Sequence, residues 1–313
     1  MKYVGIQTQV RQNNQRTIAM LLLFPVLVLA LVWLFFFVLM GMALSNEGGS
    51  FLSADSLRAS SQMTLNVLPW VFGICLLWFA IAYFVNVSII KKATHSHSLE
   101  RASNKRVYNL VENLCMTQGM AMPKLNIIED GSLNAFASGI NDKTYTVTLT
   151  RGIIQELNDE ELEGVIAHEL CHIRNRDVRL LIVSIVFVGI FSTVANILLH
   201  SLARGSNKKN NMVLILLGLA IASLGVLLSS LMRFFISRKR EYMADAGAAQ
   251  MTKKPYALAA ALKKISGRSA VSTVSNKAVS QLFIENALNK KSVLSLFATH
   301  PPIQTRIQVL EQF

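Results

Sequence analysis

Residues 158–177 read NDEELEGVIAHELCHIRNRD, and this stretch predicts a single helix. Asn158 is a candidate N-cap, Glu161 stands three positions later as in a capping box, and the first turn is acidic. His168 and His172 are four positions apart, so a helix places both imidazoles on one face, with Glu169 beside them. In this HExxH pattern two histidines can bind one metal ion while the glutamate lies next to its open position.

A catalytic zinc ion takes three protein ligands and keeps a fourth position for water. Glu241 and Asp245 are spaced i, i+4 on a second predicted helix, residues 238–249. Glu241 could supply the third ligand, and Asp245 could accept a hydrogen bond from the second nitrogen of a ligating histidine. The same spacing also suits an exposed helix whose acids pair with the basic residues 238–240.

The composition of the 313-residue chain argues against an ordinary water-soluble protein. Apolar residues make up 52% and charged residues only 16%, against about 25% charge in a typical soluble domain. A membrane-crossing helix needs about 20 apolar residues. Four stretches qualify: 18–44, 67–90, 180–199 and 212–232. The last two predict a hairpin that returns the chain to the side of His168, so that Glu241 can reach the same ion.

The lysines and arginines predict the orientation of these spans. Basic residues precede the first span and follow the second, whereas the segment 45–66 between them carries only Arg58. Both termini and the large polar parts are therefore expected in the cytoplasm. The turn 204–209 disagrees, because its three basic residues would lie outside if the hairpin crossed fully. A full crossing and a partly embedded hairpin both remain open.

The remaining polar segments predict a small α+β part. A helix is expected over 104–118, strands over 124–129 and 145–150, and a short helix after Pro302. The net charge of +13 suits segments near an anionic inner leaflet. The sequence lacks the interleaved basic and aromatic residues of single-stranded nucleic-acid binders, so no nucleic-acid partner is expected. The three cysteines form no CxxC pair, and Cys171 is expected to serve packing.

Together these motifs resemble the HtpX family of bacterial membrane zinc proteases, relatives of the CAAX prenyl endopeptidases. The likeness rests on HELCH at 168–172, SRKREYMAD at 237–245, NAFA at 134–137, HPP at 300–302 with Arg306, and the four spans. It implies a mainly α membrane protein with four hydrophobic helices and a small α+β zincin-like (gluzincin) catalytic domain.

The resemblance implies a metal-site role for each matching residue. His168, His172 and Glu241 would bind one Zn²⁺ per chain. Glu169 would be the general base toward a zinc-activated water. Asp245 keeps the supporting role that its spacing from Glu241 suggests.

It also implies two further roles. His300 would lean toward the transition-state oxyanion, with Arg306 supporting it. Substrate backbone would pair with an edge strand made of Asn134, Ala135, Phe136 and Ala137.

The expected layout follows the spans. It comprises a tail and first transmembrane helix (1–44), an extracytoplasmic loop (45–66), a second transmembrane helix (67–90), a first catalytic part (91–178), the hairpin (179–236) and a second catalytic part (237–313).

The predicted function is a zinc endopeptidase of the bacterial inner membrane, cutting membrane proteins or unfolded polypeptides at the cytoplasmic face in stress-related quality control. An intramembrane protease is disfavoured, because the charged residues that surround the motif between Glu160 and Asp177 are costly in hydrocarbon. A zinc-binding scaffold or transporter without peptidase activity is the alternative, but a structural site needs no acid at Glu169.

Overall fold

The structure is a computed structural model that describes residues 6–183, 223, 239–271, 282–284 and 301–313. The chain divides into two units. A globular unit comprises Met1–Arg16, Val85–Ile185 and Met232–Phe313, and an apolar unit comprises Thr17–Phe84 and Val186–Leu231. His300 and most of the hairpin expected at 179–236 lie outside the described residues.

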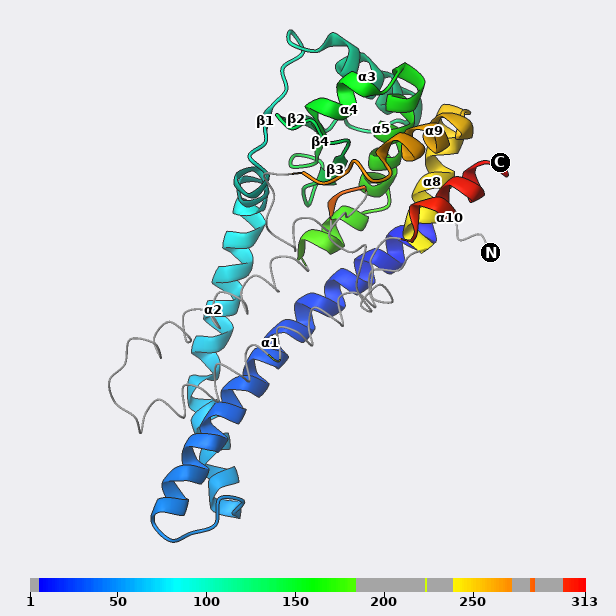
Figure 1. The fold of residues 1–313 in the computed structure, drawn as a ribbon. Helices are drawn as coiled ribbons and strands as arrows, with labels where there is room; N and C mark the ends of the chain where they lie inside the picture. The colour runs from blue at the N-terminus through cyan, green and yellow to red at the C-terminus, as the bar shows by residue number, and fades with distance from the viewer. Residues whose placement is uncertain (1–5, 184–222, 224–238, 272–281, 285–300) are drawn as a thin grey trace. The chain divides into compact units, whose positions relative to one another are not determined.

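Two 41-residue helices dominate the N-terminal third, α1 (Ile6–Asn46) and α2 (Ala54–Thr94) (Figure 1). Their stretches Val10–Ser45 and Ala54–Ile81 are long and apolar enough to cross a membrane, and only 6% of the most apolar window of each is buried inside the protein. That exposure suits contact with lipid rather than a soluble core. Among the described residues these are two of the four hydrophobic helices expected.

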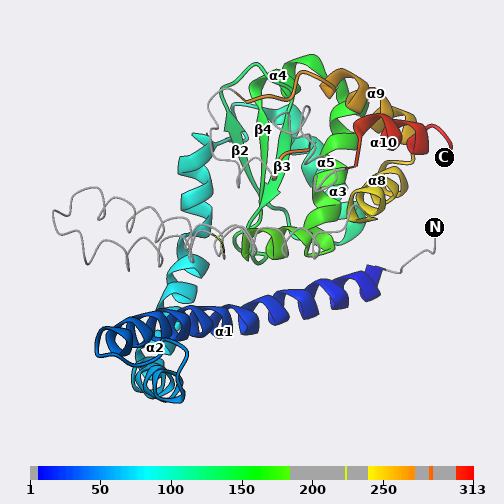
Figure 2. The same ribbon diagram turned by 60° about the horizontal axis from the view of Figure 1, so that its bottom comes forward.

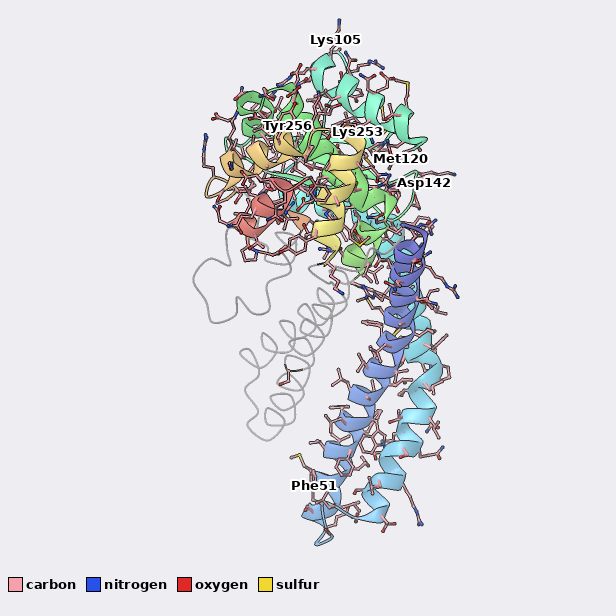
Figure 3. The ribbon with its side chains drawn as sticks, turned by 90° about the vertical axis from the view of Figure 1, so that its right-hand side faces the viewer. Phe51, Lys105, Met120, Asp142, Lys253 and Tyr256 are labelled. Atoms are coloured by element: carbon pink, nitrogen blue, oxygen red, sulfur yellow. The ribbon has the colours of Figure 1, made fainter. Side chains whose placement is uncertain are left out.

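The connection between α1 and α2 is shorter than the sequence suggested. Helix α2 begins at Ala54, so most of the segment 45–66, expected as a loop, is helical. Ser53 provides the start, because its Oγ accepts a hydrogen bond from Ser56 N at 3.1 Å. In the remaining turn Phe51 lies against Phe37, with ring centroids 5.6 Å apart (Figure 3). The first turns of α2 are polar, so the hydropathy pattern predicted a helix that begins only at residue 67.

The globular unit is built on a four-stranded sheet with the order β1-β2-β4-β3. Its strands are β1 (His97–Ser98), β2 (Lys124–Ile128), β3 (Ala135–Ser138) and β4 (Thr146–Thr150). Strands β2 and β4 are parallel, β3 pairs antiparallel with β4, and β3 forms an edge. The expected strands at 124–129 and 145–150 are thereby confirmed within one residue at each end.

The helices of this unit gather around α5, which packs against the sheet (Figure 2). They are α3 (Lys105–Gln118), α4 (Arg151–Glu156), α5 (Asp159–Arg174), α8 (Lys239–Thr252), α9 (Pro255–Ile265) and α10 (Ile303–Leu310). Helix α5 contacts β3, α3, α8 and α9, and its second half is almost entirely buried. The helix that carries the HExxH pattern is therefore held by rigid elements on several sides.

The start of α5 confirms the predicted capping box. Asn158 Oδ1 accepts a hydrogen bond from Glu161 N, and Glu161 Oε2 accepts one from Asn158 N, both at 2.9 Å. Lys264 of α9 adds an ion pair to the same Glu161 carboxylate at 2.7 Å. The cap fixes where the helix begins and hence which face His168 and His172 share.

Candidate metal centre

Helices α5 and α8 approach each other closely at the site. A Cβ atom on Gly247 of α8 would lie 2.6 Å from Cys171 Sγ of α5, closer than real Cβ atoms come. Glycine therefore allows this crossing without displacing the Cys171 side chain, and the close approach brings Glu241 to the histidine face of α5. Burial raises the pKa of Cys171 to about 12, so this thiol is a packing group, as the sequence suggested.

His168, His172 and Glu241 meet at one point, with ligand atoms all within 4.8 Å of one another. The two Nε2 atoms lie 3.1 Å apart, and each lies 3.7 Å from a carboxylate oxygen of Glu241. Ligands at bond lengths of about 2.1 Å in a tetrahedron stand about 3.4 Å apart, so these separations fit one small ion. Two imidazole nitrogens and one carboxylate oxygen are also a donor set of catalytic zinc sites.

Each histidine has a carboxylate on its other ring nitrogen. His168 Nδ1 lies 2.9 Å from Asp245 Oδ1, and His172 Nδ1 lies 3.0 Å from Asp177 Oδ2. Such partners hold the proton on Nδ1 and direct the Nε2 lone pair to the centre. Burial disfavours a charged His172, but Glu241 and Asp177 raise its pKa to about 10 in the metal-free site. A cation is therefore favoured where a metal ion would lie.

Arg306 of α10 is fully buried and pairs with Asp245. Its Nε and Nη2 atoms donate to the two Asp245 oxygens at 2.8 and 2.7 Å, and its Nη1 donates to Ile284 O at 3.2 Å. Burial would raise the pKa of Asp245, but Arg306 and His168 hold it below its ordinary value. Arg306 Nη2 also lies 3.4 Å from the ring nitrogens of His168. The support of His300 that the resemblance implied stays a prediction, because His300 lies outside the described residues.

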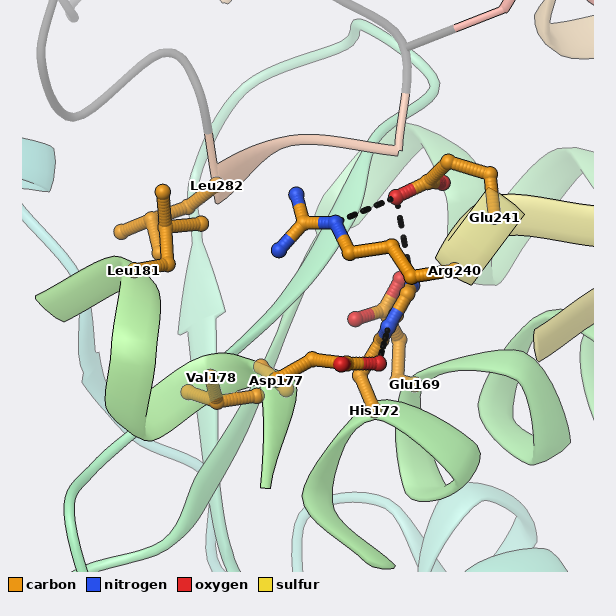
Figure 4. A pocket seen from close by; sticks show the side chains of 9 residues that line it. Glu169, His172, Asp177, Val178, Leu181, Arg240, Glu241 and Leu282 are labelled. Atoms are coloured by element: carbon orange, nitrogen blue, oxygen red, sulfur yellow. Dashed lines mark hydrogen bonds and ion pairs between the residues drawn. The ribbon is translucent and has the colours of Figure 1, made fainter. Parts of the chain in front are cut away.

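Glu169 lies beside a cavity of about 20 Å³ that is also lined by His172 and Glu241 (Figure 4). The lining residues are Ala137, Glu169, His172, Asp177, Val178, Leu181, Arg240, Glu241 and Leu282. This volume holds about one water molecule. Burial raises the pKa of Glu169, and the nearby Glu241 carboxylate raises it further against the opposing effect of the histidines. A carboxylate with a raised pKa is suited to accept and return a proton.

Arg240 is a site residue that the sequence did not single out. Its side chain is only 8% exposed, and Nε lies 3.3 Å from Glu241 Oε1 (Figure 4). The sequence allowed an exposed helix of ion pairs at 238–249, but Arg240, Glu241 and Asp245 are all buried. Residues 239 and 240 look alike in sequence, and only the packing of α8 against α5 separates their roles.

The expected edge strand lies next to the cavity and is partly covered by the chain itself. Ala135 O accepts a hydrogen bond from Ile284 N at 3.0 Å, and the rings of Phe136 and Phe283 lie 5.3 Å apart. Asn134 Nδ2 donates to a backbone carbonyl in the segment after α9, at 2.6 Å. Ala137 lines the cavity.

Two long apolar helices, a buried group that could bind a metal ion and an adjacent glutamate are features expected of a membrane metallopeptidase. Comparison with known families supports this class, since the profile of Peptidase family M48 matches residues 101–313. The chain belongs to peptidase family M48. It is 57% identical to a protein named "Protease HtpX homolog" from Bacteroides fragilis over 100% of both chains.

Two further likenesses were found. A "Protease HtpX homolog" from Dictyoglomus thermophilum is 40% identical over 76% of this chain and 81% of its own. The crystal structure of S. mikatae Ste24p covers 79% of this chain and 58% of that chain, with a TM-score of 0.47 and 18% identity.

Proposed function

We propose that the chain is a zinc-dependent endopeptidase of the bacterial inner membrane that cuts membrane-embedded or misfolded proteins at the cytoplasmic face. One observation carries the proposal: Glu169, His172 and Glu241 line the same one-water cavity, with His168 completing the ligand group. A metallopeptidase needs a general base within reach of the water that attacks the peptide bond.

His168, His172 and Glu241 are the proposed zinc ligands. When bound, zinc supplies a Lewis acid and lowers the pKa of water from about 15.7 to about 7. Asp245 and Asp177 keep the histidines in the tautomer that offers Nε2. Arg306 holds the Asp245 carboxylate in place through two hydrogen bonds.

Glu169 is the proposed general base. It takes a proton from the attacking water and passes it to the leaving amine, which changes the charge on one buried carboxylate twice per turnover. Its burial disfavours the charged form relative to the protonated form, which raises the pKa of Glu169.

His300, which lies outside the described residues, is proposed to donate a hydrogen bond to the oxyanion.

Substrate backbone is proposed to pair along β3 at its outer edge. The carbonyl of Ala135 already faces Ile284 on that edge, and alternation along a strand turns the polar groups of Ala137 to the same side. Ala137 also lines the cavity beside Glu169, so a peptide paired there would bring a carbonyl near the proposed base. Main-chain pairing accepts many sequences, which suits a quality-control protease.

The proposed cytoplasmic location rests on charge asymmetry. Arg11 and Arg16 precede the apolar part of α1, and Lys91 and Lys92 stand in the last turn of α2. Only Arg58 is basic in the segment between the two spans. Basic residues near membrane ends favour the cytoplasmic side.

Glu169→Gln, tested beside wild type, addresses the proposed function directly. The full chain is purified in detergent without metal, zinc is then added, and cutting of casein and of the chain itself is followed. Zinc should start cutting in the wild type but not in Glu169→Gln, which keeps the ligand set. Glu163→Gln, on the same helix but away from the cavity, is the matched control and should cut like the wild type.

Two results would overturn parts of the proposal. Equal cutting by Glu169→Gln would exclude Glu169 as the general base. Stoichiometric zinc binding without cutting of any substrate would favour the zinc-binding scaffold or transporter.

A further inference from the structure

The polar start of α1 is joined to the metal centre by one side chain. Asn13 Nδ2 donates to Asn175 O at 3.0 Å and to Asp177 Oδ1 at 2.6 Å. Asn13, Asn175 and Asp177 are 4%, 2% and 1% exposed. Both partners of the amide nitrogen are acceptors, so the orientation of the Asn13 amide follows from its surroundings. A residue expected in a cytoplasmic tail is therefore buried against the end of α5.

The end of α5 has an unusual conformation that needs this support. After the helix ends at Arg174, Arg176 adopts φ 60°, in the left-handed region that non-glycine residues seldom occupy. The turn sends Asp177 back toward the helix, where Oδ2 lies 3.0 Å from His172 Nδ1. The Asn13 amide donates hydrogen bonds to Asn175 and Asp177, the residues on either side of Arg176. Strain of this kind persists where surrounding contacts hold it, and it gathers at functional sites.

The orientation of a buried carboxylate is fixed by the hydrogen bonds that its two oxygens make. Asp177 receives one from Asn13 on Oδ1 and faces His172 on Oδ2. Without the hydrogen bond from Asn13, the Asp177 carboxylate could rotate away from the His172 imidazole. The His172 tautomer would then be less well controlled.

We infer that Asn13 is a positioning residue of the metal centre, acting through Asp177 on His172, so that the helix forming the first hydrophobic segment also completes the site. The inference rests on the proposed zinc ligands but not on peptide cleavage. It assigns Asn13 a role in metal binding, and a fragment that lacks this residue would bind zinc weakly although it retains His168, His172 and Glu241.

The neighbouring Asn14 provides a matched control. Its Oδ1 accepts a hydrogen bond from Arg176 at 3.3 Å in an exposed position, so it lies on the same helix and faces the same turn without contacting Asp177. Asn13→Ala and Asn14→Ala remove the same atoms one position apart. A difference between them reports the bond to Asp177 rather than the loss of an asparagine from α1.

The test measures zinc affinity by chelator competition in the full chain, with Glu169→Gln in every sample to prevent self-cutting. Asn13→Ala should weaken zinc binding about tenfold, because loss of a residue that supports a metal ligand costs about 10- to 100-fold in affinity and Asn13 acts one bond further out. Asn14→Ala should leave zinc binding unchanged. The visible spectrum of bound Co²⁺ should change in Asn13→Ala alone, which a loss of stability without altered ligation would not produce.

Asn13→Leu keeps the volume of the side chain and covers the case in which Asn13→Ala does not fold. Equal zinc affinity and equal Co²⁺ spectra in Asn13→Leu and Asn14→Ala would overturn the inference. Weak binding by Asn13→Leu, together with a chain that cuts no peptide even when Glu169 is intact, would support the inference and count against the proposed function alone. Absence of zinc binding in the reference chain would overturn both.

Discussion

Asp245 Oδ1 lies 2.9 Å from His168 Nδ1, one helical turn beyond Glu241 on α8. The same short helix thus provides a proposed ligand and the partner of another ligand. Because Asp245 is also bonded by Arg306, three elements of the globular unit converge on one carboxylate.

Arg306→Met should destabilise the globular unit strongly. It leaves Asp245 buried without its cationic partner, and breaking a buried pair by removing one side costs about 3–5 kcal/mol. Thermal unfolding in detergent with a chelator present measures the effect. Lys263→Met, which removes an exposed ion pair with Glu311, is the control and should leave the midpoint unchanged. Adding Asp245→Asn to Arg306→Met should recover part of the loss, and no recovery would contradict this account.

Zinc affinity should rise with pH. In the metal-free site burial opposes a charged imidazole, yet Glu241 and Asp177 raise the pKa of His172 to about 10. Zinc needs the neutral ring, so below that pH each ion bound displaces a proton. One displaced proton corresponds to about tenfold higher affinity per pH unit between about pH 6 and 8. Chelator competition on Glu169→Gln, corrected for protonation of the chelator, measures the slope, and a flat profile would exclude a protonated His172.

Gly247→Ala should be destabilising only while Cys171 is present. The new Cβ would lie 2.6 Å from Cys171 Sγ, and overpacking of this kind costs about 1–3 kcal/mol. In Cys171→Ala that contact disappears, and alanine then gains about 1 kcal/mol over glycine as a helix former. A double-mutant cycle of thermal midpoints should show the sign of the Gly247→Ala effect reversing. Additive effects would mean that the close approach of α5 and α8 relaxes.

Asn158→Ala should cost about 1 kcal/mol of stability while zinc affinity is retained. It removes the cap of α5, but the ligands begin more than two turns later. Asn158→Asp, which keeps an accepting side chain, should behave like the wild type. Thermal unfolding and zinc titration of the three chains separate the two effects. A large loss of zinc affinity in Asn158→Ala would show that the whole helix depends on its first turn.

Local spacing predicts much of the site. A helix fixes residues three and four positions apart, so the pattern at 158–177 and the pair Glu241 and Asp245 could be interpreted before any fold was known. The capping box and the strand at 145–150 are local in the same sense. Predicting these features required only the residue periodicity of a single helix or strand.

Contacts after a helix end or across the chain could not be predicted in this way. Asp177 reaches His172 because Arg176 takes a left-handed conformation that its sequence does not favour. Asn13 belongs to a polar run that resembles any cytoplasmic tail, and its partners stand more than 160 positions later. The hairpin at 179–236 and the role of His300 stay predictions, since they fall largely outside the described residues.

The separation of the proposed ligands along the chain has a consequence for biosynthesis. Glu241 follows His172 by 69 positions. At a synthesis rate of about 5–20 residues per second, the ribosome needs about 3–14 s to add it. During that interval the nascent chain carries both histidines and Glu169 but lacks the third ligand. The proposed site therefore lacks a ligand until the intervening hydrophobic segments have been synthesised, and activity is expected only after that point.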